Sequence, residues 1–399
     1  MIYRRFGRTE LQMPVLSCGG MRCQQGGTDL DLSTLDQERH ANHEAVLRRA
    51  LELGVNHYET ARGYGSSELE MGLVLAKLPR EQFLLQTKIS PKEDPRVFVD
   101  EVNDSIKRLQ VDALDLLTLH GVNNREMMKC ALRPGGCLEE ARKLQRQGKT
   151  RFVGFSTHAV LDEILETIDH DRDGGFDYVN LHWYYIFQHN WPAIEAAQRR
   201  DMGVFIISPS DKGGRLYDPP DRLVELCKPL HPIVFNDLFC LSRPQVHTLS
   251  VGAAKPEEFD LHVEAVDQLD RADEQAGPIA ARLERAMRGA VEPEFADPFG
   301  MGLPRWQQMP GEVNVQMLVW LHHLATAWDM IDYGKMRYNL LGRGGHWFPG
   351  QTAQGVDDDV LREALSHVDT ADKIIEVLRR ADAMLADAPV DRLTNQGNR

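Results

Sequence analysis

The chain has 399 residues, of which 42% are apolar and 27% charged, and it carries a formal net charge of −14 at pH 7. This composition is that of a globular protein, and the length suffices for a barrel of about 250 residues and a second element. The acidic balance argues against a nucleic-acid partner, because such a partner requires a basic face that neutralises phosphates.

Strand-like and helix-like stretches alternate up to about residue 270, as in a series of βα units. Eight short apolar runs are predicted to be strands: Val15–Cys18, His57–Thr60, Phe83–Lys88, Leu114–His120, Arg151–Ser156, Tyr178–Leu181, Val204–Ile207 and Thr248–Gly252. Amphipathic stretches lie between them and are predicted to be helices, for example Glu44–Leu53, Val97–Leu109, Leu138–Gln147 and Trp191–Arg200. Eight units without a glycine-rich phosphate motif after the first strand favour an α/β fold of the (β/α)8 TIM-barrel type over an open sheet.

The rest of the chain shows no strand alternation, which predicts a C-terminal helical extension. We therefore expect a barrel over residues 1–270, a helix and linker over 271–300, and a helical C-terminal extension over 301–399.

The cysteines and the apolar segments indicate the compartment. None of the six cysteines stands in a C-x-x-C pair, which is typical of reduced thiols in the cytoplasm. The first residues lack the apolar core of a signal peptide, and no later apolar run is long enough to span a bilayer. We expect a cytoplasmic protein with no membrane partner, and its oligomeric state stays open.

Four chemically active side chains stand at or just after predicted strand ends. Glu59 closes the second strand, Tyr64 follows it between two glycines, and Lys88 and His120 close the third and fourth strands. The C-terminal ends of barrel strands converge on the face that carries active sites. Taken singly, each residue also fits an ordinary role, such as a turn aromatic, a helix cap, a solvated lysine or a core histidine. Their joint placement favours a site.

These residue types suit the reduction of a carbonyl group. No side chain donates hydride, so a nicotinamide cofactor is required. Tyr64 is the predicted proton donor, and the cation of Lys88 would lower its pKa from the ordinary value near ~10. Glu59 would hold the ammonium, and His120 would orient the carbonyl by a hydrogen bond.

At these positions the chain resembles the aldo-keto reductase family, over about residues 1–270. The resemblance is carried by the opening hairpin 3–11, by Glu59-Thr60-Ala61…Tyr64-Gly65-Ser66-Ser67-Glu68…Gly72, and by Thr87-Lys88, Leu119-His120 and Gly154-Phe155-Ser156. It implies a (β/α)8 barrel and an NAD(P)H-dependent reductase of a small-molecule carbonyl substrate. It also implies that Tyr64, Lys88, His120 and Glu59 form the catalytic tetrad.

The resemblance further implies a set of cofactor-binding residues: Gly20, Met21, Ser156, Thr157, Asn180, Ser208, Lys212, Gly252, Lys255 and Glu258. Lys255 is the candidate partner of a 2′-phosphate and favours NADPH. Glu258 places a negative charge nearby, so NADH stays possible. Lys212 has two open interpretations, a pyrophosphate contact or a solvated loop lysine.

Four positions depart from the family pattern. Glu59 replaces an aspartate, Thr157 an asparagine, Asn180 a glutamine, and Ile207 a tyrosine that stacks on the nicotinamide ring. The changes at Thr157 and Asn180 keep hydrogen-bonding groups, so we expect cofactor binding to tolerate these departures better than turnover does.

Two segments resemble metal-binding motifs but lack essential ligands. Leu303–Val315 resembles the end of a ferredoxin-like motif, yet Met309 replaces the cysteine and no cysteine follows Cys240. We therefore predict a degenerate segment without an iron–sulfur cluster. Asp169–Gly174 resembles the start of a calcium loop, but the twelfth position is Asn180 rather than glutamate. We expect no metal site.

Three functions remain open at this point. The first is a carbonyl reductase, and the second a sensor or docking module that binds the nicotinamide cofactor with little turnover. The third is an isomerase or aldolase that uses Lys88 as a Schiff-base amine.

Overall fold

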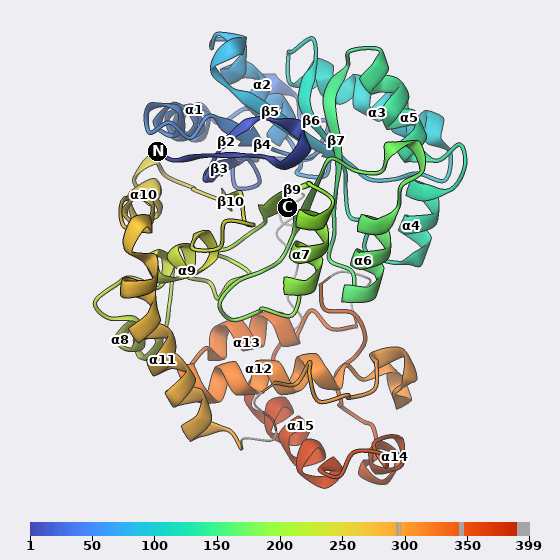
Figure 1. Ribbon diagram of the computed structural model, residues 1–399, viewed down its shortest axis with the longest axis vertical. Coiled ribbons are helices and arrows are strands. Elements are labelled where there is room, and N and C mark those ends of the chain that lie inside the picture. The colour runs from blue at the N-terminus through green and yellow to red at the C-terminus, as the bar shows by residue number, and fades with distance from the viewer. Residues whose placement is uncertain (293–294, 296, 343–346, 389–399) are drawn as a thin grey trace. The chain divides into compact units, whose positions relative to one another are not determined.

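The computed structural model describes residues 1–292, 295, 297–342 and 347–388. Its centre is a closed barrel of eight parallel strands in the order β10-β3-β4-β5-β6-β7-β8-β9 (Figure 1). The strands are β3 (Leu16–Gly19), β4 (His57–Glu59), β5 (Leu84–Ile89), β6 (Leu114–Leu119), β7 (Thr150–Ser156), β8 (Tyr178–Leu181), β9 (Gly203–Ile206) and β10 (Thr248–Val251). Each coincides with a predicted strand to within one residue at either end, so the predicted TIM barrel is confirmed.

Helices follow the strands along the chain. They are α1 (Gln37–Glu52), α2 (Ser67–Leu75), α3 (Pro95–Arg108), α4 (Arg125–Leu132), α5 (Cys137–Arg146), α6 (Leu161–Asp169), α7 (Trp191–Arg199), α8 (Asp221–Cys227), α9 (Pro232–Leu241) and α10 (Phe259–Asp267). The four helices predicted from amphipathic periodicity are confirmed as α1, α3, α5 and α7. Each of α1 and α3 begins at an aspartate cap, Asp36 or Asp94, whose carboxylate accepts backbone N–H bonds of the first turn.

Side chains along the barrel strands alternate between the interior and the surrounding helices. In β4, His57 points inward to Ser17, with 2.7 Å between Nδ1 and Oγ. The next residue, Tyr58, points outward, and its hydroxyl donates to the Leu47 carbonyl of α1 at 2.7 Å. Glu59 then points inward again. This register places the acid of β4 among the residues that line the barrel.

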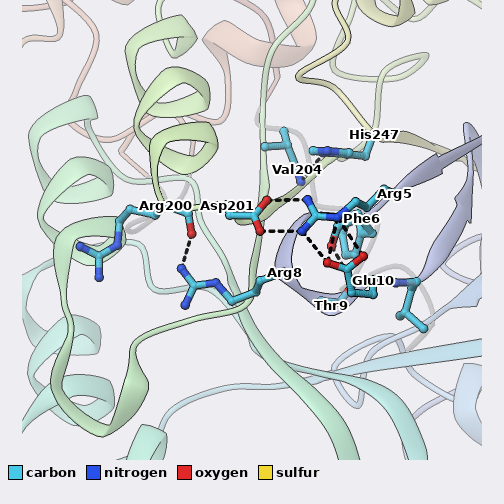
Figure 2. A network of polar contacts seen from close by, with 10 residues as sticks. Arg5, Phe6, Arg8, Thr9, Glu10, Arg200, Asp201, Val204 and His247 are labelled. Carbon is cyan, nitrogen blue, oxygen red and sulfur yellow. Dashed lines mark hydrogen bonds and ion pairs between the residues drawn. The ribbon is translucent and has the colours of Figure 1, made fainter.

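A two-stranded hairpin precedes the barrel, formed by β1 (Tyr3–Arg5) and β2 (Gln12–Pro14). It lies at the N-terminal ends of β8 and β9, where the Phe6 ring packs against Gly203 so closely that a side chain there would clash. The buried cluster comprises Phe6, Leu11, Met13, Leu116, Tyr178 and Phe205. The Arg5 side chain is exposed and pairs with Asp201 at 2.7 Å and with Glu10 at 2.6 Å. Figure 2 shows this network.

The chain divides into two compact units that do not follow chain order. Among the described residues, one unit comprises 1–213 and 236–272, and the other comprises 214–235 together with the described part of 273–392. The second unit contains most of α11 (Ala272–Ala290) and, drawn in orange and red in Figure 1, α12 (Val315–Trp328), α13 (Ile331–Tyr338), α14 (Asp358–Ala364) and α15 (Ala371–Leu385). The predicted helices of the C-terminal third are thus confirmed, whereas residues 343–346 and 389–399 of the predicted extension lie outside the described residues. Residues 270 and 300 as domain boundaries stay a prediction.

Helix α12 is the centre of the second unit. It is apolar on almost every side, and its residues from Met317 to Ala325 are all buried. It packs against α13 and α15, and the Trp328 indole at its end donates to the Leu283 carbonyl of α11 at 3.1 Å. In the described part of the chain, no helix combines the length and the apolar character that crossing a membrane requires.

Candidate active site

Three barrel strands bring an acid, a lysine and a serine together. The side chains of Lys88 on β5 and Glu59 on β4 are both almost fully buried, and the Lys88 ammonium donates to Glu59 and to the Thr60 carbonyl, the latter at 3.0 Å. The other oxygen of Glu59 accepts a hydrogen bond from Ser250 Oγ on β10 at 2.7 Å. A Cβ at Gly19 would lie 3.0 Å from Glu59 Oε1. The longer acid therefore fits because its neighbour on β3 has no side chain.

Tyr64 and His120 lie beside this ion pair. Tyr64 stands in the loop between β4 and α2, and the Lys88 ammonium is 4.9 Å from the centre of its ring. The imidazole of His120, directly after β6, meets the Tyr64 ring edge to face, with centroids 5.7 Å apart. All four residues of the predicted tetrad thus gather at the C-terminal ends of β4, β5 and β6, on the face where barrel enzymes place their chemistry.

Burial and charge set the protonation of the three groups. Burial raises the pKa of Tyr64, and the positive charge of Lys88 only partly opposes this rise. The pKa therefore lies above its ordinary value, and the predicted lowering by Lys88 is wrong as a net effect, because the cost of burying the phenolate is larger. Burial by itself would lower the pKa of Lys88, but Glu59 and Tyr64 outweigh it, so the lysine stays charged. The pKa of His120 is lowered to about 3, mainly by burial and further by the charges of Lys88 and Lys212. At neutral pH the cluster therefore presents a protonated phenol, a cation and a neutral imidazole.

A second group of predicted residues lies at the ends of β7 and β8, where Ser156 and Asn180 are register partners. Asn180 is fully buried, and no described residue gives its amide nitrogen or oxygen a hydrogen-bond partner. Ser156 Oγ accepts the N–H of Gly121 at 3.0 Å and keeps its own O–H for donation. The Thr157 hydroxyl instead donates to the Val122 carbonyl at 2.7 Å. Asn180 is the strongest indication of an absent partner, since a buried amide without hydrogen bonds is unfavourable.

The fit to a nicotinamide carboxamide follows from these groups. A carboxamide offers an N–H₂ donor and a C=O acceptor, which match the free oxygen and nitrogen of the Asn180 side chain. The residues present therefore suit the cofactor that the sequence predicts.

Three further predicted residues lie after β10. Gly252 has open space around its Cα, and the first atoms that a Cβ would meet belong to the Arg22 side chain, at 3.8 Å. Glu258 accepts the N–H of Ala254 at 2.7 Å, so its carboxylate braces the loop. Lys255 stands exposed between them. A phosphate group would fit here, because Arg22 and Lys255 are basic and the backbone at Gly252 is open.

The remaining predicted cofactor residues lie in two loops. Gly20 follows β3, and its carbonyl accepts from Ser67 Oγ at 2.8 Å, with Met21 next along the chain and partly exposed. After β9, Ser208 has a left-handed backbone (φ 53°), and its carbonyl accepts the N–H of Lys212 at 3.0 Å. The charge of Lys212 reaches His120, which places this loop on the same face as the tetrad.

Sequence reasoning did not find several residues of this face. Ser250 lies within the predicted strand Thr248–Gly252 and was given no role, yet it is the second partner of Glu59. Arg22, beside Gly252, has no motif that signals it. His158 and His182 form a hydrogen-bonded, stacked imidazole pair with centroids 4.4 Å apart, just beyond β7 and β8. The sequence offered one indication of this pair, since His182 comes directly after the apolar run of β8.

Comparisons with known proteins agree on one family. The model of the Aldo/keto reductase family matches residues 16–218, about half of the chain. Relatives include L-galactose dehydrogenase of Arabidopsis thaliana, 28% identical over 35% of this chain and 46% of its own length. Others, from Escherichia coli K12, are L-glyceraldehyde 3-phosphate reductase (25% identical; 40% of this chain, 46% of the relative) and NADH-specific methylglyoxal reductase (27% identical; 34% and 46%). The chain thus spans about half the length of these curated relatives.

Solved structures resemble the fold. An aldo-keto reductase of Bacillus halodurans superposes with a TM-score of 0.57 at 21% identity, over 71% of this chain and 96% of that one. A putative aldo-keto reductase of Pseudomonas aeruginosa gives 0.53 at 21% identity, over 68% and 95%. At this identity the likeness concerns the fold alone.

Proposed function

Because the chain belongs to the aldo/keto reductase family, we propose that it reduces an aldehyde or ketone to the alcohol with a nicotinamide cofactor. One observation carries the proposal: the buried Lys88–Glu59 pair lies against Tyr64, with His120 at the edge of the same ring. An ion pair buried in a barrel is costly to desolvate, and active sites are where such costs are common.

Each member of the tetrad has one task in this proposal. Tyr64 gives its phenolic proton to the carbonyl oxygen as negative charge develops there. Lys88 stabilises the phenolate that remains, and Glu59 with Ser250 fixes the ammonium in position. His120 is neutral, so one ring nitrogen carries a proton and can donate a hydrogen bond to the same oxygen.

The cofactor residues divide into two groups. Asn180 and Ser156 would hold the carboxamide end, and Gly252, Lys255 and Arg22 the phosphate end. When bound, the nicotinamide cofactor supplies the hydride. Glu258 is engaged by the Ala254 N–H, whereas Lys255 is exposed, which supports NADPH over NADH.

The remaining assignments follow from the same basis. We expect a small-molecule carbonyl substrate, no nucleic-acid or membrane partner, and a cytoplasmic location. We also expect no iron–sulfur cluster, because thiolates are its required ligands and no cysteine follows Cys240.

The test is turnover by Tyr64→Phe beside the unchanged protein. Both would first be titrated with NADPH and NADH by tryptophan fluorescence. NADPH oxidation would then be followed on a carbonyl panel that includes methylglyoxal and glyceraldehyde 3-phosphate. We expect NADPH to bind both proteins equally and turnover to fall about 10²–10⁴-fold in the variant.

Other outcomes separate the alternatives. Cofactor binding without turnover on any carbonyl would favour the sensor function. Turnover that survives Tyr64→Phe would contradict the role of the tyrosine. A Lys88 adduct trapped by borohydride would favour the Schiff-base enzyme.

A further inference from the structure

Outside the proposed active site, two neighbouring helices bring together three groups that can bind a metal. His40 and His43 lie one turn apart on α1, and Glu70 lies on α2. One ligand atom of each lies within 4.8 Å of the others. The imidazole rings are nearly perpendicular, at 86°, with centroids 6.4 Å apart.

The second observation is that the histidines lack hydrogen bonds. His43 is only 2% exposed, yet neither of its ring nitrogens has a hydrogen-bond partner among the described residues. The same holds for Nδ1 of His40. Removing polar nitrogens from water without a new partner is unfavourable. A bound cation would accept the lone pair on one nitrogen of each ring and so reduce this penalty.

Glu70 is already held in place by hydrogen-bond donors. It is 1% exposed, and Oε1 accepts from Ser66 Oγ at 2.5 Å and from the Gln25 N–H at 2.9 Å. Among the described residues, the one hydrogen-bond donor to Oε2 is Gln25 Nε2, at 3.0 Å. Since a carboxylate oxygen has two lone pairs, Oε2 can still bind a cation. Such supporting hydrogen bonds are typical of the shell around metal ligands.

We propose that His40, His43 and Glu70 bind one divalent transition-metal ion, with Zn²⁺ as the best match. Two imidazoles and one carboxylate form a donor set that Zn²⁺ accepts, with a fourth position left for a water or another small ligand. Mg²⁺ and Ca²⁺ prefer oxygen ligands, and this set contains mainly nitrogen.

The ion would connect α1 to α2. Through Glu70 and Gln25 it would also stabilise the β3–α1 loop, since the Gln25 side chain accepts the N–H of Asp36 at 2.8 Å across that loop. Gly20 and Met21, both predicted to contact the cofactor, begin the same loop. The site therefore adds a stabilising link next to the cofactor loop and takes no part in the proposed reaction.

The sequence did not predict this site, because its ligands form no known spacing. A His-x-x-His pair on a helix is common, and Glu70 follows 27 positions after His43. Only the packing of α1 on α2 brings the carboxylate to the imidazoles.

The test is Zn²⁺ binding by the metal-free, untagged full chain, measured against a chromogenic chelator and by calorimetry. His40→Ala and Glu70→Gln are the informative variants, because His40 is partly exposed and glutamine keeps the shape of Glu70. Matched controls are His367→Ala and Glu38→Gln, both exposed on the structure. Circular dichroism verifies that each variant is folded.

We expect one equivalent of Zn²⁺ per chain, with affinity at least tenfold lower in His40→Ala and Glu70→Gln and unchanged in both controls. Zn²⁺ should also raise the melting temperature of the unchanged protein and of the controls, but not of the two variants. Equal binding by the unchanged protein and by His40→Ala would overturn the proposal. So would weak, multiple binding only, which would mean adventitious surface histidines. Neither readout involves carbonyl turnover, so failure here leaves the proposed function untouched.

Discussion

The Lys88 ammonium lies 4.9 Å from the centre of the Tyr64 ring and is held there by the buried carboxylate of Glu59. One cation therefore serves two partners, a carboxylate that fixes it and a phenol whose pKa, raised by burial, it partly brings back down. The stability of the barrel and the acidity of the proposed proton donor depend on the same charge.

Lys88→Met should destabilise the protein by about 3–5 kcal/mol, because it leaves Glu59 buried without a counter-ion. The measurement is urea unfolding at neutral pH. Lys77→Met is the matched control, since Lys77 pairs with Glu44 at the surface and should cost about 0–1 kcal/mol. Equal stability of the two variants would contradict the role of Lys88 as a buried counter-ion.

His57 should make stability depend on acid pH. Burial lowers its folded pKa to about 3, whereas the unfolded value is near ~6.5. Its contribution is fully present above ~6.5 and is lost as pH falls towards 3, at about 1.4 kcal/mol per pH unit. When the pH is lowered from about 7 to about 5, the free energy of unfolding should fall in both proteins. The fall should be about 2 kcal/mol smaller in His57→Gln than in the unchanged protein. His367→Gln, at an exposed position, should match the unchanged protein.

Asn180 and Thr157 should differ in their effect on cofactor binding. The Asn180 amide has no partner in the described structure, whereas the Thr157 hydroxyl is engaged by the Val122 carbonyl. Asn180→Ala should weaken NADPH binding about tenfold, which corresponds to one or two hydrogen bonds. Thr157→Val should change it less than about threefold. Fluorescence titration measures both, and the reverse order would place the carboxamide at Thr157.

Lys255→Gln should weaken NADPH binding about tenfold at low salt and leave NADH binding unchanged, because only NADPH carries the 2′-phosphate. Added salt should reduce the difference, since Lys255 is exposed. Lys107→Gln, exposed on α3, should affect neither nucleotide. A parallel loss of NADH affinity would instead place Lys255 near a phosphate common to both cofactors.

The N-terminal hairpin should be stabilised mainly by its apolar residue. Phe6 is fully buried against Tyr178 and Gly203, so Phe6→Ala should cost about 3–5 kcal/mol. Arg5 pairs with Glu10 and Asp201 at the surface, in the network of Figure 2. Arg5→Ala should therefore lower the free energy of unfolding by less than about 1 kcal/mol. Chemical unfolding of the two variants compares them directly, and a larger loss for Arg5→Ala would show that the network is a coupled one.

The strands were predictable because each is a short apolar run with a clear end. Leu114–Leu119, for example, is fully buried and stops at His120. The prediction of the tetrad had the same basis, since all four of its proposed members close or follow such runs. Tertiary contacts were not predictable: nothing near Glu59 in the chain indicates Ser250, which lies 191 positions later and reaches the acid only because β10 closes the barrel beside β3.

Residues 214–235 illustrate a second limit. The predicted barrel over residues 1–270 includes them, whereas α8 packs with α12 of the second unit. Local periodicity reports an apolar face but not which distant helix covers it.

The assignment of residues 214–235 to the second unit has a consequence for folding during synthesis. The ribosome releases residues 214–235 between the seventh and eighth barrel strands, long before the helices that they pack with. The barrel strands are all present once β10 has emerged, whereas α8, whose Leu223 and Cys227 are buried in the folded protein, must wait for α12, nearly ninety positions later. Since domains generally fold as units during synthesis, we expect the nascent chain to pass through a stage with a complete barrel and an exposed apolar segment. A stop codon placed after α10 would fix that stage permanently and yield a chain prone to aggregate, even though every residue of the proposed tetrad is present.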